Sequence, residues 1–173
     1  FKGITMIKDY YNANPDSMQA ALATLQSYGN AGKKIAILGE MNELGRFSSA
    51  EHRRLGELCR EMTDVVFFVG DSYQDFAKGY GESRHAFKTK EELCVYLKEY
   101  IISANIGEKD VILIKGSRSM KMEEVFAHLK KYLDMDYSED SFKYLPSTAV
   151  KLHVDVSAMQ NNIRKIQNAV SEN

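Results

Sequence analysis

The turn that decides the fold is Asp9-Tyr10-Tyr11-Asn12-Ala13-Asn14-Pro15-Asp16-Ser17, and it lies between a short apolar alternation and a helical pattern. Asn14 is a favoured N-cap residue, and Pro15 suits the first helical position, where its missing N–H costs nothing. After the turn, the apolar residues have the spacing of one helical face: Met18, Ala21, Leu22 and Leu25. The turn therefore predicts a helix that begins at Pro15 directly after a strand.

The same turn is suited to binding an anion. The free N–H groups of the first helical turn and the positive end of the helix dipole attract negative charge. A well-capped helix start without any ligand fits residues 9–17 equally well, because Asn-rich caps are common. The stretch by itself leaves both interpretations open.

Strands alternate with helices along the next hundred residues. Buried strands are expected at 34–38, 65–69 and 111–114, and a weaker strand at 85–87. Two capping boxes, Ser48 with Glu51 and Thr89 with Glu92, mark helix starts between them. This alternation predicts an α/β fold, in which a mostly parallel sheet is covered by helices on both faces.

Three loops that follow strands are unusually polar: residues 9–17, 39–46 and 115–119. Ligands bind beyond the carboxyl ends of the strands in such sheets, so we expect these loops to line one edge together. The last loop offers Lys115, Gly116, Ser117, Arg118 and Ser119, and its arginine can clamp a carboxylate or a phosphate. A solvated turn is the alternative for this loop.

The loop at 39–46 contains two carboxylates, Glu40 and Glu43, which would suit the ammonium group of a ligand. A plain exposed acidic loop accounts for them equally well. His85, His128 and His153 have no metal-ligand spacing with one another or with the cysteines, and His52 is interpreted as a packing or surface residue. We therefore assign no catalytic residue and no metal ligand from spacing.

Composition excludes several classes of partner. The chain has 173 residues, with 23 lysines and arginines against 24 aspartates and glutamates, so no charge surplus favours nucleic acid or an anionic membrane. No apolar run is long enough for membrane insertion. Cys59 and Cys94 fall inside helical patterns and are interpreted as small hydrophobes, which indicates a cytoplasmic setting.

The chain divides into three parts. Residues 1–133 form the α/β domain, and 134–147 are predicted to be a linker because acidic residues alternate there with Tyr and Ser. Residues 148–173 have the pattern of one strand and one helix, too little to form a core. The abrupt start and this short second unit suggest a piece of a longer protein, with missing domains on both sides.

Four motifs in the first part, at residues 11–17, 38–45, 51–56 and 115–123, resemble those of the C-terminal domain of the Mur ligases. Within that family, Asn12 and the pair Ser117-Arg118 favour the branch that adds D-Ala-D-Ala to UDP-N-acetylmuramoyl-tripeptide in peptidoglycan synthesis. The resemblance implies a closing domain that is inactive without the N-terminal and central domains. The central domain would hold the phosphates of ATP and the Mg ligands.

The resemblance also implies roles for residues. The family activates the tripeptide carboxylate as an acyl phosphate, which the amine of D-Ala-D-Ala then attacks. The residues expected to face the ribose and base of ATP are Asp9, Tyr11, Asn12 and Asn14. The residues expected to face the end of the tripeptide and the incoming dipeptide are Glu40, Glu43, Lys115, Ser117, Arg118 and Ser119. Lys8 stands where the family often has a second acid, which leaves that position without an expected role.

Residues 148–163 are similar to the opening strand and helix of alanine racemase, a pyridoxal-phosphate barrel that some bacteria fuse to the ligase. The Lys-Ala-x-Ala-Tyr-Gly stretch with the cofactor lysine is not in this chain, so pyridoxal phosphate would belong only to the missing racemase part.

Two other functions fit parts of the pattern. One is a related ligase that adds a different amino acid. The other is a non-catalytic α/β ligand-binding module, such as a receiver-type domain. Receiver domains need clustered aspartates, whereas here Asp9 stands alone and the turn at 70–72 is too sparse for a magnesium cluster.

Overall fold

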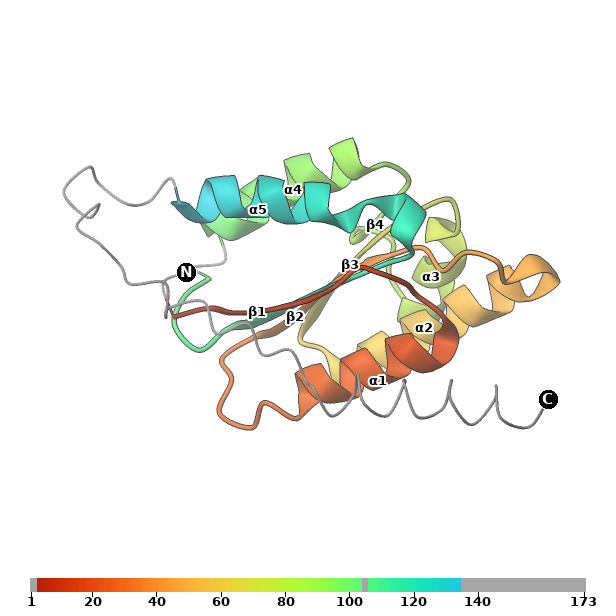
Figure 1. The fold of residues 1–173 in the computed structure, drawn as a ribbon, viewed down its shortest axis with the longest axis horizontal. Helices are drawn as coiled ribbons and strands as arrows, with labels where there is room; N and C mark the ends of the chain where they lie inside the picture. Colours follow the sequence, from red (N-terminus) through yellow and green to blue (C-terminus); the bar gives the residue numbers. More distant parts are fainter. Residues whose placement is uncertain (1–2, 104–105, 135–173) are drawn as a thin grey trace, which may run out of the picture.

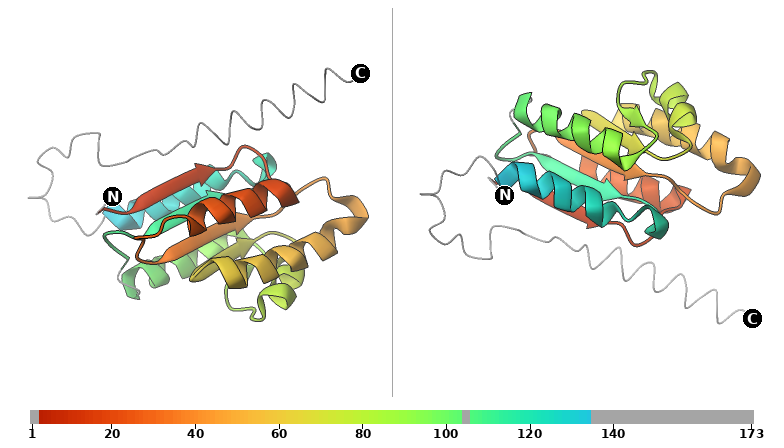
Figure 2. Two further views of the ribbon diagram at one scale, coloured as in Figure 1. Left: turned by 90° about the horizontal axis from the view of Figure 1, so that it is seen from below. Right: turned by 90° about the horizontal axis from the view of Figure 1, so that it is seen from above.

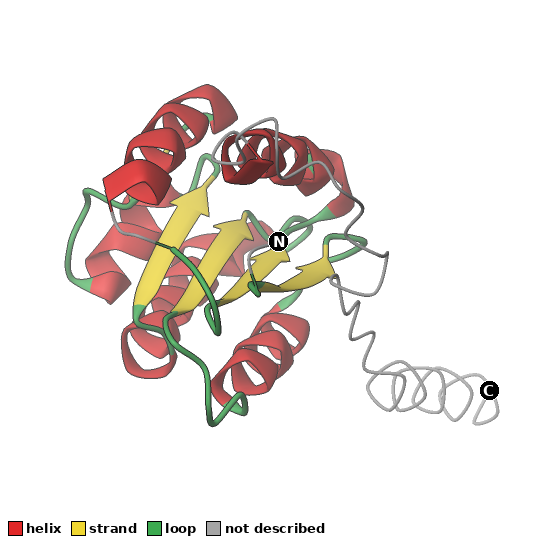
Figure 3. Ribbon diagram, turned by 90° about the vertical axis from the view of Figure 1, so that its left-hand side faces the viewer, coloured by secondary structure: helices red, strands yellow, loops and turns green. Residues whose placement is uncertain are grey.

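A single parallel sheet organises the chain in the computed structural model, which describes residues 3–103 and 106–134. Its strands, in the spatial order β1-β5-β2-β3-β4, have these bounds: β1 Thr5–Asp9, β5 Val111–Lys115, β2 Lys34–Gly39, β3 Val65–Val69 and β4 Ala86–Phe87. Every neighbouring pair among these strands is parallel, and the longer strands point the same way in Figure 3. The predicted unit at 148–173 and the linker after Asp134 lie outside the described residues.

Helices cover both faces of this sheet (Figure 1). One face carries α1 Pro15–Gln26, α2 Ser48–Met62 and α3 Tyr73–Tyr80, and the other carries α4 Lys90–Ser103 and α5 Met122–Asp134. The two views in Figure 2 show α1 and α2 in front of the sheet on one side, and α4 and α5 on the other. The predicted α/β fold with a covered parallel sheet is confirmed, although α5 extends through Asp134, the first residue of the expected linker.

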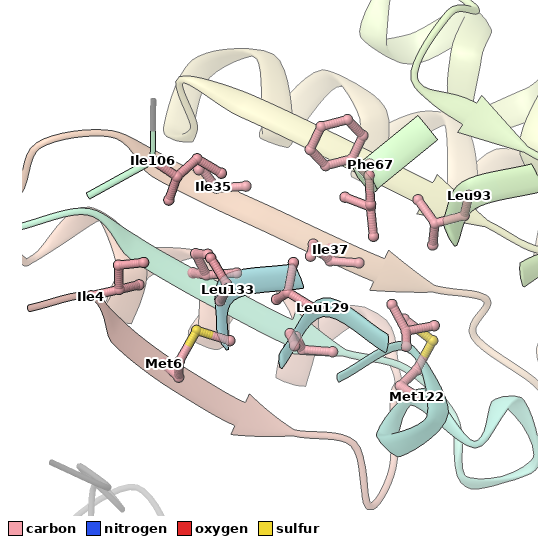
Figure 4. Packing of buried hydrophobic residues seen from close by; sticks show 14 of the residues in the cluster. Ile4, Met6, Ile35, Ile37, Phe67, Leu93, Ile106, Met122, Leu129 and Leu133 are labelled. Atoms are coloured by element: carbon pink, nitrogen blue, oxygen red, sulfur yellow. The ribbon is translucent and has the colours of Figure 1, made fainter. Parts of the chain in front are cut away.

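The strands feed two separate cores because successive side chains of a strand point to opposite faces. In β2, Ile35 and Ile37 pack with Leu129 and Leu133 of α5, as Figure 4 shows. The intervening Ala36 and Leu38 pack with the helices of the opposite face. All five residues of β5 are buried, as expected for a strand covered on both sides.

Two predicted helix starts are confirmed. Asn14 Oδ1 accepts a hydrogen bond from Ser17 N at 2.8 Å, while Ser17 Oγ accepts one from Asn14 N at 3.0 Å, so α1 begins at Pro15 behind a capping box. Thr89 Oγ1 accepts from Glu92 N at 3.3 Å, and Glu92 Oε2 accepts from Thr89 N at 3.2 Å.

The predicted capping box of Ser48 and Glu51 is wrong. A short 3-10 helix, η1 Gly45–Phe47, runs directly into α2, so Ser48 already has helical backbone angles and no side chain caps the helix. The Ser48 hydroxyl instead lies 3.2 Å from Nδ1 of His52, one turn further along. An N-cap residue needs non-helical backbone angles, and the preceding 3-10 turn has already given Ser48 helical ones. The Ser48-Glu51 pattern was therefore misleading.

The connections reverse direction at β5. Helices α1, α2 and α3 carry the chain from β1 across to β4 on one face, and α4 returns it on the other face to β5, between β1 and β2. The loops after β1 and β2 therefore lead to one face, whereas the loop after β5 leads to the other. This arrangement creates the topological switch point at which α/β sheets bind ligands.

Helices α2 and α3 approach until their backbones touch. A Cβ added to Gly79 would lie 1.8 Å from the Arg53 carbonyl oxygen, and one added to Gly56 would lie 2.3 Å from the Phe76 carbonyl oxygen. Both contacts are with backbone, which cannot rotate away as a side chain can. The position of α3 therefore depends on these two glycines.

We expect Gly79→Ala to lower the free energy of unfolding by about 1–3 kcal/mol or more, because the new methyl group forces the two helices apart. Urea denaturation monitored by circular dichroism measures the change. Gly29→Ala is the matched control, since nothing lies within 4 Å of its added Cβ. Equal stability of the two variants would contradict the close contact.

His85 is buried beside Phe67 and Tyr96, with ring centroids 5.1 and 5.7 Å away. Its Nδ1 has no hydrogen-bond partner among the described residues and lies 3.4 Å from Oε1 of Glu82. Burial lowers the pKa of His85, and the Glu82 carboxylate only partly opposes the effect. The folded protein therefore holds this histidine neutral more strongly than the unfolded chain does.

This shift predicts a loss of stability in acid. Because the pKa of His85 is lower in the folded state, the unfolded chain takes up the proton first as pH falls through about 6.5. The stabilisation is complete above that pH and is lost below it. The wild type should lose more unfolding free energy than His85→Phe between about pH 7.5 and 5.5; equal losses would contradict the assignment.

Candidate functional site

The three polar loops meet at the carboxyl edge of the sheet, around the end of β5. Hydrogen bonds join the loop after β5 to the loop after β1 on one side and to the loop after β2 on the other. The predicted convergence of residues 9–17, 39–46 and 115–119 is therefore confirmed as a spatial arrangement. The ligands assigned to individual residues remain predictions.

Lys115 joins the first and last loops. Its side chain is only 1 % exposed, and its Nζ donates to Asp9 Oδ2 at 2.7 Å and to the Asn12 carbonyl oxygen at 2.8 Å. Lys115 and Asp9 are directly paired across β5 and β1, which places both side chains at the strand ends. The ammonium group is thus held by the protein itself.

The loop after β1 divides its polar groups between the fold and the solvent. Asn12 Oδ1 accepts from Ala13 N at 2.8 Å, and Asn14 Oδ1 is used in the cap of α1. By contrast, Tyr11 is 83 % exposed, and the Asp9 side chain is 47 % exposed despite its bond to Lys115. Asn12 and Asn14 are exposed as well, but their Oδ1 atoms are bonded within the loop, so the Asp9 carboxylate and the Tyr11 ring are the clearer candidates for contact with a ligand.

The loops after β2 and β5 are joined by Asn42, a residue that sequence analysis did not single out. Its backbone N–H donates to Ser117 Oγ at 2.8 Å, and its side-chain Nδ2 donates to Ser119 Oγ. Ser117 is buried, and its own N–H donates to the Glu40 carbonyl oxygen at 3.1 Å. Of the two serines, only Ser119 lies toward the exposed side of the loop.

Glycines permit this close approach. A Cβ on Gly116 would lie 3.1 Å from the Cα of Gly39 and 2.7 Å from Cγ of Met122, at the first turn of α5. The ends of β2 and β5 can approach this closely because neither glycine carries a side chain.

Arg118 lies at the outer side of the last loop, in the short helix η2 Arg118–Met120. Its Nη1 donates to Glu123 Oε1 at 2.6 Å, and the side chain is 61 % exposed. The pKa of the Glu123 carboxyl is held below its usual range. The larger cause is a hydrogen bond from the backbone N–H of Glu123 itself, and the second is the hydrogen bond from Arg118. The guanidinium keeps further donors available for an anion.

Glu40 brings a fourth loop to the site. Its Oε2 accepts from Asp71 N at 2.8 Å and its Oε1 accepts from the Ser72 hydroxyl at 2.6 Å, both in the turn after β3. From the sequence, residues 70–72 were expected only to be too sparse for a magnesium cluster. The position of this turn after another buried strand was the signal for its place at the same edge.

Glu43 differs from Glu40 because it is exposed, at a backbone position with a positive φ of 63°. Of the two predicted partners for an ammonium group, Glu43 is therefore the more accessible.

His52 stabilises this edge from the interior of the domain. It is fully buried, its Nε2 accepts from Met41 N at 3.0 Å, and its Nδ1 donates to the Ser48 carbonyl oxygen at 2.8 Å. These bonds place the proton on Nδ1, since Nε2 must be free to accept. Of the two interpretations of His52, as a packing or a surface residue, its burial supports packing, and its bond to Met41 N fixes the loop that contains Glu40 and Asn42.

The described part of the chain contains no group of three or more His, Cys, Asp or Glu residues that could hold a metal ion. Cys59 and Cys94 are free thiols, and burial raises the pKa of the Cys59 thiol well above its ordinary value. None of the described helices has the length and apolar character needed to cross a membrane.

The fold and the edge define a parallel α/β domain with a polar switch-point surface, the type of surface at which such sheets bind ligands.

Comparison with known proteins identifies the family. Residues 1–118 match the family described as Mur ligase, glutamate ligase domain. This chain belongs to that family, as the resemblance of the four motifs predicted.

Relatives with this domain are named UDP-N-acetylmuramoyl-tripeptide–D-alanyl-D-alanine ligase. The protein of Buchnera aphidicola is 35 % identical over 127 residues, which is 73 % of this chain and 27 % of the relative. The protein of Bacillus subtilis is 35 % identical over 133 residues, covering 73 % of this chain and 28 % of the relative. The chain thus spans little more than a quarter of the length of these relatives.

Solved structures agree with this result. MurF from Acinetobacter baumannii has a TM-score of 0.67 and 33 % identity, covering 76 % of this chain and 29 % of that one. MurF from Thermotoga maritima, solved in complex with ADP, has a TM-score of 0.63 and 28 % identity, covering 79 % and 30 %.

The carboxylate of Glu40 has a structural role that a variant can test. We expect Glu40→Gln to lower the free energy of unfolding by about 1–3 kcal/mol, because one charge-assisted acceptor becomes an amide donor facing the turn at 71–72. Thermal or urea unfolding measures this change. Glu43→Gln is the matched control and should stay within about 0.5 kcal/mol of the wild type. A neutral Glu40→Gln would contradict the role.

Proposed function

We propose that this chain supplies the closing domain of an ATP-dependent ligase that joins D-Ala-D-Ala to UDP-N-acetylmuramoyl-tripeptide in peptidoglycan synthesis, in the cytoplasm. The observation that carries the proposal is the joined edge of three strand-end loops in a Mur ligase domain. The names of the relatives support the choice of substrates. The remaining domains of the ligase would lie outside this chain.

The proposed reaction has two steps. The tripeptide carboxylate attacks the terminal phosphorus of ATP, so that ADP leaves and an acyl phosphate forms. The amine of D-Ala-D-Ala then attacks the acyl carbon, phosphate leaves, and the amine proton is lost. Both steps depend on positioning and on charge neutralisation, which are the contributions a closing domain makes.

The nucleoside of ATP would contact the loop after β1. The half-exposed Asp9 carboxylate is suited to accept hydrogen bonds from ribose hydroxyls, and the exposed ring of Tyr11 offers a surface for the base. Asn12 and Asn14 would contribute through their amide N–H groups, because their Oδ1 atoms are bonded within the loop and the cap.

The other loops would receive the peptide substrates. The exposed Arg118 guanidinium is suited to a peptide carboxylate, and Glu43 to the ammonium of the incoming dipeptide. Ser119 would donate from the outer side of the loop. Glu40, Lys115 and Ser117 support this surface from within, since their polar groups are bonded to neighbouring loops.

Mg²⁺ would be held elsewhere in the complete ligase. The resemblance to the Mur ligases implies that the Mg ligands lie in the central domain, which would also hold the phosphates of ATP. Bound Mg²⁺ would neutralise charge on the phosphates.

We further propose that residues 148–173 begin an alanine-racemase domain, whose pyridoxal phosphate would be held beyond this chain. Their sequence similarity to the opening strand and helix of that enzyme supports the assignment. These residues lie outside the described part of the chain. A Lys-Ala-x-Ala-Tyr-Gly stretch downstream in the gene would test it, and its absence would overturn the fusion.

The complete ligase tests the main proposal. Incubation with ATP, UDP-N-acetylmuramoyl-tripeptide and D-Ala-D-Ala should release ADP and give a product heavier than the tripeptide substrate by the dipeptide minus water. A related ligase for another amino acid is the second candidate, since the family itself is described by its glutamate ligase domain. Product formation with D-glutamate or L-lysine instead of D-Ala-D-Ala would favour that candidate.

Residue roles can be separated kinetically. In the complete ligase, Asp9→Ala and Asn12→Ala should raise KM for ATP about tenfold, and KM for D-Ala-D-Ala much less, because these residues face the nucleoside. Steady-state kinetics with each substrate varied in turn measures both values. Glu57→Ala, on the exposed side of α2, is the control. Unchanged ATP kinetics in both loop variants would refute the assignment.

A further inference from the structure

Lys115 is the one buried lysine among the described residues. It ends β5, the strand between β1 and β2, and its ammonium group is closed off from solvent by bonds to Asp9 and to the Asn12 carbonyl oxygen. The resemblance to the Mur ligases led us to expect a substrate contact at this position. The geometry favours a different role.

Burial of a charged amine is unfavourable unless the protein supplies charge and hydrogen bonds. For Lys115 both come from the loop after β1. Asp9 Oδ2 supplies the charge at 2.7 Å and the Asn12 carbonyl oxygen supplies a second acceptor at 2.8 Å. The lysine therefore binds two points of this loop that are three residues apart, and this fixes the path of the backbone between them.

The bonds also set how the loop faces outward. Asp9 is held by one carboxylate oxygen while its side chain stays 47 % exposed, so its carboxylate is anchored in one orientation. Tyr11 lies between the two anchored residues and is the most exposed large hydrophobic residue of the domain's described part. A ligand meeting Asp9 and Tyr11 would find them already positioned, which lowers the entropic cost of binding.

The link continues beyond the lysine. Gly116 and Ser117 follow directly, and Ser117 accepts from Asn42 N at 2.8 Å. The end of β5 thus connects the loop after β1 with the loop after β2.

We propose that Lys115 is a positioning residue, which holds Asp9 and the backbone at Asn12 so that the loop of residues 9–14 is preformed for the nucleoside of ATP, and that it does not itself contact substrate. The proposal rests on the proposed function for the identity of the ligand. The preformed state of the loop does not depend on that function and can be measured in this chain alone.

Kinetics of the complete ligase test the role toward the ligand. Lys115→Met keeps the length of the side chain and removes its charge. We expect it to raise KM for ATP by about tenfold, the effect of losing a charge-assisted hydrogen bond, with KM for D-Ala-D-Ala and for the tripeptide substrate within about twofold of wild type. Lys131→Met, exposed on α5, is the matched control and should leave all three values unchanged.

A double-mutant cycle distinguishes positioning from direct contact. If Lys115 acts by holding the loop, Lys115→Met and Asp9→Ala release the same loop, so the variant with both changes should raise KM for ATP by clearly less than the product of the two single effects. If the two changes multiply, or if Lys115→Met raises KM for a peptide substrate and leaves ATP unaffected, Lys115 contacts a ligand itself and the proposal is overturned.

Amide exchange in the 173-residue chain provides a readout without any activity. Lys115→Met should speed exchange of the Ala13 N–H, which is bonded to Asn12 Oδ1, by about tenfold or more, while Leu113 in the middle of β5 keeps its protection. Unchanged exchange at Ala13 would overturn the proposal. If Lys115→Met does not fold, Asp9→Asn is the second variant. It removes the negative charge that pairs with Lys115 and should speed exchange of the Ala13 N–H in the same way.

The two hypotheses can fail separately. If the complete wild-type ligase does not couple ATP cleavage to addition of D-Ala-D-Ala, the proposed function fails, and the exchange experiment still decides whether Lys115 holds the loop.

Discussion

The position of β5 between β1 and β2 is the constraint on which the rest of the structure depends. The last strand of the domain is inserted between the first two, so Val111 is paired with Thr5 on one side and with Lys34 on the other. Its five residues are all buried, and each large apolar side chain contributes about 1.5–3 kcal/mol when removed from water. The sheet is therefore completed only when segments more than a hundred residues apart come together. The same insertion brings three loops from distant parts of the sequence to one edge.

That edge contains two kinds of polar residue with different tasks. Lys115, Ser117, Glu40 and His52 have their polar groups bonded to neighbouring loops, and they hold four strand ends in fixed relation. Tyr11, Glu43 and Arg118 project outward from these supports. Asp9 belongs to both sets, since one oxygen is bonded to Lys115 and the side chain is half exposed. A domain that closes over substrates held elsewhere needs this division, because rigid supports keep the outward groups in place before the ligand arrives.

Local patterns predicted most of the fold. Apolar periodicity indicated most of the described strands and helices, whereas β4 was expected mainly from its position in the alternation, and the 3-10 helices η1 and η2 were not predicted. The caps at Asn14 and Thr89 were found because a capping box lies within four consecutive residues. The Ser48 prediction failed for a local reason as well, since η1 had already given the chain helical geometry. The predictions for individual site residues were less complete. Asn42, Ser72 and the support of Met41 by His52 were missed, because each depends on a partner that periodicity cannot locate.

The amino-acid sequence by itself determined the order of strands and helices, the polar character of three strand-end loops and the resemblance to the Mur ligases. These follow from side-chain periodicity, from turn residues and from short motifs, all of which act over a few neighbouring residues. Only the tertiary structure decided which polar groups face a ligand and which support the loops. Lys115 and Arg118 are three residues apart, yet one is buried against Asp9 and the other is exposed beside Glu123. The physical reason is that hydrogen-bond partners and burial are set by the pairing of distant strands, which no stretch of sequence contains on its own.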